Sequence, residues 1–201
     1  MFGRIVCSDS VAVIGATERP GTVGRTVLSN LMESRSRSKV YAVNPSHSEV
    51  LGLKAYKSIG DISEKVDLAV VVTPAVTVSN VVGECAEAGV RAAVVISAGF
   101  RERGPEGAAL EQQIQQQLRR GTMRLIGPNC LGIMNPAIGL NATFASGMPK
   151  AGNVAFLQPE RRINHCNLGL ESARRSGLQR DRLDWLNVGC GLGRLDRLLW
   201  R

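Results

Sequence analysis

The chain has 201 residues, of which 44% are hydrophobic and 21% charged, a composition typical of a globular protein with one or two domains. Aromatic residues make up only 4%, which argues against a protein that binds single-stranded nucleic acid by stacking on its bases. The formal net charge is +8, and much of it comes from residues 158–201, which contain nine arginines, five acidic residues and no lysine. The charge therefore indicates a partner only if this tail is a functional segment.

The five cysteines form no Cys-x-x-Cys pair, and the only two histidines, His47 and His165, are far apart in the sequence. This spacing predicts neither a disulfide framework nor a metal site, and it favours a reduced, cytoplasmic protein. No apolar run reaches the roughly 18 residues that a membrane-spanning helix needs, and the N-terminus lacks the apolar core of a signal peptide. We therefore expect neither a membrane nor a nucleic acid as partner.

Short apolar runs alternate with amphipathic segments of helical length up to about residue 135. The expected strands are residues 11–14, 40–43, 68–72, 92–96 and 124–126. The expected helices are residues 24–31, 77–88 and 105–120, and residues 56–64 are expected to form a loop or a short helical turn. The strands are apolar on both faces, as in a parallel sheet covered by helices on both sides. The pattern predicts an α/β fold, namely a Rossmann-like doubly wound parallel sheet.

Small and turn-forming residues follow the expected strands, at the edge of the sheet where open α/β folds bind their ligands. The first such loop runs from Gly15 to Gly24 and leads into a helix. Its free amides and the positive end of the helix dipole favour a phosphate, to which Thr17 adds a hydroxyl and Arg19 a charge. The alternative is a plain strand-to-helix turn without a ligand.

The second strand ends in Asn44-Pro45 and carries no acidic residue at its tip. An NAD site usually has an acid there for the ribose hydroxyls, so this ending argues against NAD. Cys130 has no neighbouring histidine in the sequence that would activate its thiol, and we interpret it as a small packed residue. With no Ser-His-Asp set, paired carboxylates or metal-ligand spacing, the sequence predicts no catalytic residue and no metal ligand.

Six strand-end motifs together resemble, in order, the CoA-binding domain of NDP-forming acyl-CoA synthetases, a family that includes ADP-forming acetate–CoA ligase. The resemblance covers about residues 9–157. The motifs are Val11-Ala12-Val13-Ile14-Gly15-Ala16-Thr17, Pro20-Gly21-Thr22-Val23-Gly24, Val43-Asn44-Pro45, Thr73-Pro74-Ala75, Ser97-Ala98-Gly99-Phe100 and Gly127-Pro128-Asn129-Cys130.

The resemblance implies that coenzyme A lies along these strand ends, as in the related α subunit of succinyl-CoA synthetase. It assigns the phosphates to the glycine loop, the nucleotide end to the loop after the second strand, and the pantetheine arm to the later strand ends. The implied cofactor-binding residues are Gly15, Ala16, Thr17, Arg19, Gly21, Val23, Gly24, Asn44, Pro45, Thr73, Pro74, Ser97, Ala98, Gly99, Asn129 and Cys130. In the intact family a second domain carries a phosphorylated histidine and an ATP-grasp domain uses ATP or ADP with Mg²⁺, whereas some members are fused to an acetyltransferase domain.

The resemblance breaks after Leu157, where the family continues with Ser-Gln-Ser-Gly-Ala and this chain has Gln-Pro-Glu-Arg-Arg. Codons chosen for Gln158 onward (CAG-CCA-GAG-CGG-CGC) restore the family pattern in the neighbouring reading frame. We therefore expect a CoA-binding domain at 1–145, the start of a truncated second domain at 146–157 and a frameshift product at 158–201. The alternative is a genuine divergent tail, a basic helix that docks on a partner or on nucleic acid.

The sequence thus predicts the CoA-binding module of an acyl-CoA synthetase, or of a related acetyltransferase, without ligase activity of its own. The missing ligase and ATP-grasp domains are then expected to be encoded separately. Two alternatives are an NAD(P)-binding oxidoreductase domain and a non-catalytic module that senses CoA or acyl-CoA.

Overall fold

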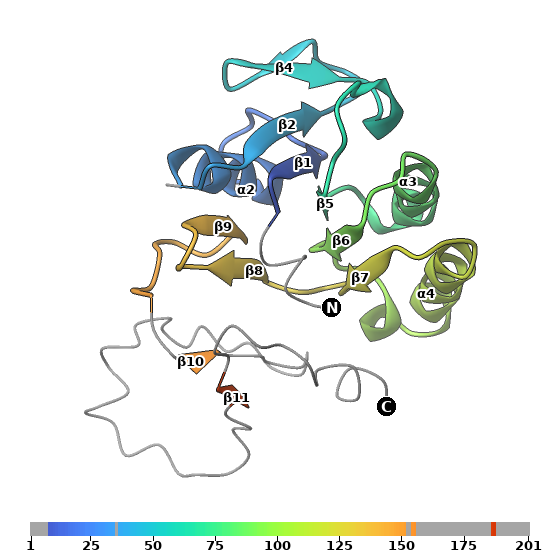
Figure 1. The fold of residues 1–201 in the computed structure, drawn as a ribbon. Coiled ribbons are helices and arrows are strands. Elements are labelled where there is room, and N and C mark those ends of the chain that lie inside the picture. The colour runs from blue at the N-terminus through green and yellow to red at the C-terminus, as the bar shows by residue number, and fades with distance from the viewer. Residues whose placement is uncertain (1–7, 35, 152–153, 156–185, 188–201) are drawn as a thin grey trace.

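The computed structural model describes residues 8–34, 36–151, 154–155 and 186–187. Its main sheet has seven strands in the order β3-β4-β2-β1-β5-β6-β7, and every neighbouring pair except β3–β4 is parallel (Figure 1). The strands are β1 (Ser10–Ile14), β2 (Lys39–Val43), β3 (Glu49–Val50), β4 (Leu53–Tyr56), β5 (Leu68–Val71), β6 (Ala92–Val95) and β7 (Arg124–Ile126). This topology confirms the predicted Rossmann-like α/β fold.

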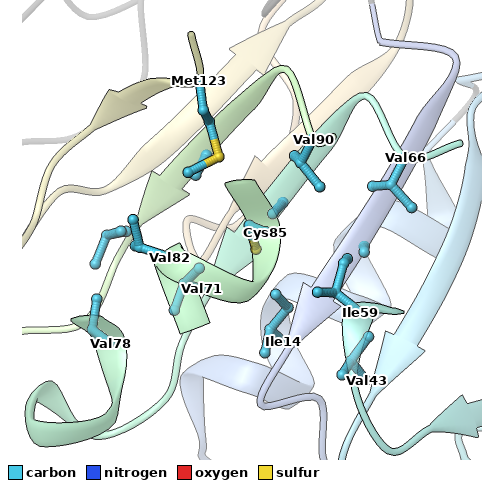
Figure 2. Packing of buried hydrophobic residues seen from close by; sticks show 14 of the residues in the cluster. Ile14, Val43, Ile59, Val66, Val71, Val78, Val82, Cys85, Val90 and Met123 are labelled. Atoms are coloured by element: carbon cyan, nitrogen blue, oxygen red, sulfur yellow. The ribbon is translucent and has the colours of Figure 1, made fainter. Parts of the chain in front are cut away.

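Helices cover both faces of the sheet because its central strands are buried on both sides. The helices are α2 (Val23–Glu33), α3 (Ala75–Glu87) and α4 (Pro105–Leu118), with short 3₁₀ turns η1 (Ile59–Asp61) and η2 (Arg101–Arg103). On one face Val27 and Leu28 of α2 pack against Val11 and Val13 of β1. The other face packs against α3, α4 and η1, and Figure 2 shows this second cluster around Val78, Val82 and Cys85.

Two hairpins were not predicted from the sequence. The first joins β3 to β4 through Leu51 and Gly52, which both adopt positive φ, at 51° and 78°. The second consists of β8 (Gly132–Asn135) and β9 (Leu140–Thr143), and β9 lies beside α2 (Figure 1). Asn30 of α2 fixes this hairpin, because its amide donates hydrogen bonds to the carbonyls of Thr143 and Ala145 at 2.8 and 3.0 Å.

A further antiparallel pair joins β10 (Val154–Ala155) to β11 (Leu186–Asn187). Apart from β11, the expected frameshift product at 158–201 lies outside the described residues. Among the helices that the structure describes, none is long and apolar enough to cross a bilayer.

Candidate functional site

The parallel strands all end at one edge of the sheet, and the candidate site lies there. The chain runs from β1 outward to β2 on one side, whereas β5, β6 and β7 extend to the other, so the strand order changes direction between β1 and β5. Ligands of open α/β sheets bind at such a switch point. Gly15 follows β1 and Thr73 follows β5, and a β-carbon on Gly15 would lie only 3.1 Å from Cγ2 of Thr73. The loops after these two strands are therefore in contact.

The glycine loop, residues 15–24, folds back so that α2 begins against the end of β1. Gly15 has a φ of 94°, a backbone conformation that favours glycine. A β-carbon on Gly24 would lie 2.4 Å from the Gly15 carbonyl oxygen, which is a steric clash with main chain. Gly21, with φ 75°, has nothing within 4 Å of such a carbon, so it faces open space. The loop thus needs Gly24 for close packing and Gly21 only for its turn.

The N-terminus of α2 is open toward this edge. Thr22 occupies the N-cap position, but its hydroxyl donates to the Arg19 carbonyl at 2.7 Å, and no side chain within the described residues caps the helix. Thr17 Oγ1 accepts a hydrogen bond from the Arg19 amide at 3.2 Å, which leaves the Thr17 hydroxyl hydrogen available to a ligand. Arg19 itself is exposed. Uncapped first-turn amides, a hydroxyl and a guanidinium are the groups that hold a phosphate.

The residues after β2 support the glycine loop. The Asn44 side-chain amide donates to the Ala16 carbonyl at 2.7 Å, and its oxygen accepts from the Ser46 amide at 2.8 Å. Pro45 is exposed beside it. Both polar atoms of the Asn44 side chain thus form hydrogen bonds within the protein. The Asn44 side chain holds the glycine loop in place and does not itself face a ligand.

Hydrogen bonds also join the ends of β5, β6 and β7. Ser97 Oγ donates to the Thr73 carbonyl at 2.5 Å, and the Asn129 amide donates to the Ser97 carbonyl at 2.9 Å. Cys130 Sγ donates to the Val95 carbonyl at 3.3 Å. The remaining predicted residues here are Pro74, which is exposed at the N-cap of α3, and Ala98 and Gly99 in the turn after β6. The structure therefore brings the three predicted strand-end groups together into one continuous wall.

The hydroxyl of Thr73 is the one buried polar group of this wall that stands out. Its Oγ1 is fully buried and has no hydrogen-bond partner within the described residues. A buried hydroxyl without a partner costs about 1–3 kcal/mol, so such a group usually has a role that the protein alone does not show. It lies at the switch point beside Gly15, but it is covered by protein atoms, so a ligand can reach it only if the loops around Gly15 and Thr73 move apart.

Two carboxylates of the site were missed by the sequence reasoning. Glu102 Oε1 accepts hydrogen bonds from the Gly99 amide and, at 3.1 Å, from the Phe100 amide. Partial burial raises the pKa of Glu102, but these backbone hydrogen bonds outweigh it and hold the pKa below its ordinary value. Glu18 Oε1 accepts from the Leu51 amide at 2.7 Å and ties the glycine loop to the β3–β4 hairpin. Glu18 lies in the glycine loop and Glu102 in the short turn η2, and the sequence pattern gives no signal for either contact.

The described residues include two cysteines, Cys85 in the core and Cys130 in the loop after β7. Burial, with a smaller effect of Glu84, raises the pKa of the Cys85 thiol to about 12, so it stays protonated in the core. Cys130 is half-buried. The part of the chain that the structure describes contains no cluster of three His, Cys, Asp or Glu side chains that could hold a metal ion.

A separate hollow of about 830 Å³ lies at the opposite edge of the sheet. It is bounded by residues before β1, the end of α2 and the β8–β9 turn, and among its lining residues are Asp9, Glu33, Arg37 and Ile138. None of the predicted site residues lines it, and the helix N-termini point elsewhere. Size alone therefore does not make it the better candidate, and we place the site at the strand ends.

The sheet topology, the glycine loop and the open helix N-terminus together define a nucleotide-binding domain of the Rossmann type. Residues 9–136 match the family described as the CoA binding domain, and this chain belongs to that family.

The relatives include the ADP-forming acetate–CoA ligase I of Archaeoglobus fulgidus, which is 48% identical over 154 residues, or 77% of this chain and 22% of that protein. The α subunit of the ADP-forming acetate–CoA ligase II of Pyrococcus furiosus is 47% identical over 147 residues, or 73% of this chain and 32% of that protein. This chain therefore spans about a fifth to a third of the length of such relatives.

Two solved structures also share the fold of this chain. A crystal structure of a Pyrococcus horikoshii protein superposes with a TM-score of 0.74 at 44% identity, covering 78% of this chain and 35% of that one. The dinucleotide-forming acetyl-coenzyme A synthetase 1 of Candidatus Korarchaeum cryptofilum, in complex with phosphate and ADP, has a TM-score of 0.68 at 38% identity and covers 72% of this chain and 31% of that one.

Proposed function

We propose that this chain binds CoA or acyl-CoA along the carboxyl ends of its parallel strands, as the nucleotide-binding module of an ADP-forming acyl-CoA ligase. The observation that carries the proposal is the match to the CoA-binding domain family over residues 9–136. The names of the relatives support the ligase assignment, since they include acetate–CoA and 4-hydroxybutyrate–CoA ligases.

The chemistry of the site fits the two parts of CoA. The phosphates bind at the glycine loop, where α2 offers uncapped amides and Arg19 offers a positive charge. The uncharged pantetheine arm follows the wall formed by Thr73, Ser97 and Asn129. The buried Thr73 hydroxyl donates to one of its amide carbonyls once the loops around Gly15 and Thr73 move apart to expose it. The Asn44 side chain already bonds the Ala16 carbonyl, so it acts by holding the loop for the ligand.

The binding test is thermal unfolding of the purified chain with CoA, NAD⁺ and NADH at equal concentrations. A ligand that binds only the folded state at 100 times its Kd stabilises that state by about 2.7 kcal/mol. We expect CoA to raise the melting temperature and both nicotinamide cofactors to leave it unchanged. Stabilisation by NADH with no response to CoA would instead support an oxidoreductase domain.

We further propose that this chain does not complete the ligase reaction by itself. The intact reaction converts an acid, CoA and ATP into acyl-CoA, ADP and phosphate, and the family supplies its ATP, Mg²⁺ and phosphohistidine chemistry from other domains. Three of the relatives are named as α subunits, which supports separately encoded partner subunits. We expect no acyl-CoA when the chain is incubated with acetate, CoA, ATP and Mg²⁺, and formation of acetyl-CoA would contradict this proposal.

We also propose the domain boundaries expected from the sequence: a CoA-binding domain at 1–145, the start of a second domain at 146–157, and a frameshift product at 158–201. The break in the family pattern after Leu157 supports this division. The coding DNA tests it, because a single-base shift near codon 158 has to restore the reading Ser-Gln-Ser-Gly-Ala. A cytoplasmic location goes with this proposal.

A further inference from the structure

We propose that Glu102 is a positioning residue, which fixes the turn after β6 against the pantetheine arm of CoA through two backbone amides. This inference rests on the proposed function. Glu102 bonds the Gly99 and Phe100 amides of this turn, so it acts on a bound ligand through the turn.

The contact itself is a carboxylate bound by two consecutive amides. Glu102 Oε1 accepts from the Gly99 and Phe100 amides, and Gly99 has a φ of 110°, a conformation that non-glycine residues rarely adopt. The direction of the Glu102 pKa shift agrees with hydrogen bonding to the ionised form. The carboxylate therefore stabilises an unusual backbone conformation that the turn would otherwise hold less well.

The segment that carries Glu102 is itself firmly held. Arg101 Nε donates to Glu111 Oε2 of α4 at 2.6 Å, which ties η2 to that helix. Phe100 is fully buried, and a β-carbon on Gly107 would lie only 1.7 Å from the Phe100 carbonyl oxygen. Because η2 is fixed on both sides, the Glu102 carboxylate has a defined position from which to hold the turn.

The held turn contacts the residues that we place along the pantetheine arm. The turn starts at Ser97, whose Oγ donates to the Thr73 carbonyl and whose carbonyl accepts from the Asn129 amide. Farther along the turn, a β-carbon on Gly99 would be 3.0 Å from Cβ of Ala75, the first residue of α3. A shift of Gly99 would therefore move the wall on both sides of Ser97. Because Glu102 already occupies the Gly99 and Phe100 amides, this turn offers no free donor pair for a phosphate, which agrees with the phosphates binding at the glycine loop.

The experiment measures the affinity of three single variants for two probes. The variants are Glu102→Ala, Glu102→Gln and the control Glu106→Ala, which removes an equal charge from the exposed first turn of α4. The probes are CoA and adenosine 3′,5′-bisphosphate, which carries phosphates but no pantetheine. We expect Glu102→Ala to weaken CoA about tenfold, the size of one charge-assisted hydrogen bond, and to leave the bisphosphate unchanged. Glu102→Gln keeps an acceptor oxygen and should restore most of the CoA affinity.

A ligand-free measurement separates this inference from the proposed function. Amide hydrogen exchange at Gly99 and Phe100 should be faster in Glu102→Ala than in the wild type and in Glu106→Ala. If the wild type binds no CoA but this exchange difference is found, the proposed function fails while the role of Glu102 in holding the turn stands. If CoA binds, and Glu102→Ala changes neither CoA affinity nor amide exchange, or weakens both probes equally, the inference is wrong.

Discussion

The glycine loop and the wall formed by Thr73, Ser97 and Asn129 lie at the same edge of the sheet, but they differ in how they use their hydrogen-bonding groups. In the glycine loop, Thr22 turns its hydroxyl to Arg19 and leaves the first turn of α2 uncapped. In the wall, backbone and side-chain groups bond one another, and the Thr73 hydroxyl is the exception. The difference indicates that the loop provides charge and free donors, whereas the wall provides shape and a single buried donor.

The largest effect is expected for Gly24→Ala in the glycine loop. Its β-carbon would lie 2.4 Å from the Gly15 carbonyl oxygen, so the start of α2 has to move away from β1. Clashes of this kind cost roughly 3 kcal/mol, and we expect the free energy of unfolding to fall by about that amount in a denaturant titration. CoA binding should be lost along with the loop geometry.

Gly21→Ala is the matched control, because a β-carbon there meets nothing within 4 Å. Only its φ of 75° opposes alanine, at a cost of about 1 kcal/mol. Equal losses of stability in the two variants would show that the close approach of α2 to β1 does not exist.

Thr73→Val should separate binding from stability. Valine keeps the shape and removes a buried hydroxyl that has no partner within the described residues, so the ligand-free protein should become more stable by about 1 kcal/mol. CoA affinity, measured by calorimetry, should fall about tenfold because the amide carbonyl of the pantetheine arm loses the Thr73 hydroxyl as its hydrogen-bond donor.

The control for this variant is Thr143→Val, since the Thr143 side chain is also buried but its hydroxyl donates to Asn141 Oδ1 at 2.7 Å. This change should destabilise the protein by about 1 kcal/mol and leave CoA affinity unchanged. If Thr73→Val destabilises the free protein as Thr143→Val does, the Thr73 hydroxyl is satisfied without a ligand and its proposed role fails.

Arg19→Ala tests the charge of the glycine loop. Arg19 is exposed, so its interaction with a phosphate is screened by salt, and we expect CoA to bind about fivefold more weakly at low ionic strength. The difference should nearly vanish at about 1 M salt, where charges are screened within about 3 Å. Arg37→Ala removes the same charge at the opposite edge of the sheet and should leave CoA affinity unchanged. If both variants weaken CoA equally, the effect comes from the net charge of the protein and not from a phosphate contact of Arg19.

Cysteine labelling followed by mass spectrometry compares the wall with the core. The half-buried Cys130 should react with a thiol reagent, and CoA should slow its labelling severalfold by covering the end of β7. Cys85, whose pKa burial raises to about 12, should stay unlabelled with or without CoA. Unchanged labelling of Cys130 at saturating CoA would place the ligand away from this strand end.

The smallest expected effect is the pH dependence of the stability that Glu102 contributes by holding the turn after β6. Because the folded-state pKa of Glu102 lies below its ordinary value of 4.5, its ionised form stabilises the fold above that pH. This stabilisation is lost as pH falls through the lowered pKa. The melting temperature of the wild type should exceed that of Glu102→Gln near neutral pH, and the gap should close below about pH 4.5. A gap that is constant with pH would show that ionisation of Glu102 does not hold the turn.

The core of the fold could be predicted from the sequence because its strands are apolar on both faces, as β1, β5 and β6 show. The β3–β4 hairpin could not, since Leu51 occupies a position with positive φ where glycine or asparagine is usual. The distant carboxylate of Glu18 bonds the Leu51 amide there, a contact that no local pattern contains. In β9, the buried side chains of Asn141 and Thr143 bond each other and hide the apolar pattern of a strand.

The position of the candidate site followed from the rule that parallel strands end at one edge, which predicts that Gly15, Thr73 and Ser97 lie near one another. Their hydrogen bonds could not be predicted in the same way. The Asn44 side chain bonds the Ala16 carbonyl of a loop 28 residues away in the sequence. Glu102 bonds the Gly99 amide from η2, which Arg101 ties to α4. Neither contact follows from a local pattern.

The most direct test is amide hydrogen exchange across the whole domain with and without saturating CoA. We predict slower exchange at residues 15–26, at the start of α3 and in the turn at residues 97–99, and no change around the opposite hollow at residues 33–38. Protection at that hollow, with none in the glycine loop, would contradict the assignment of CoA to the strand ends.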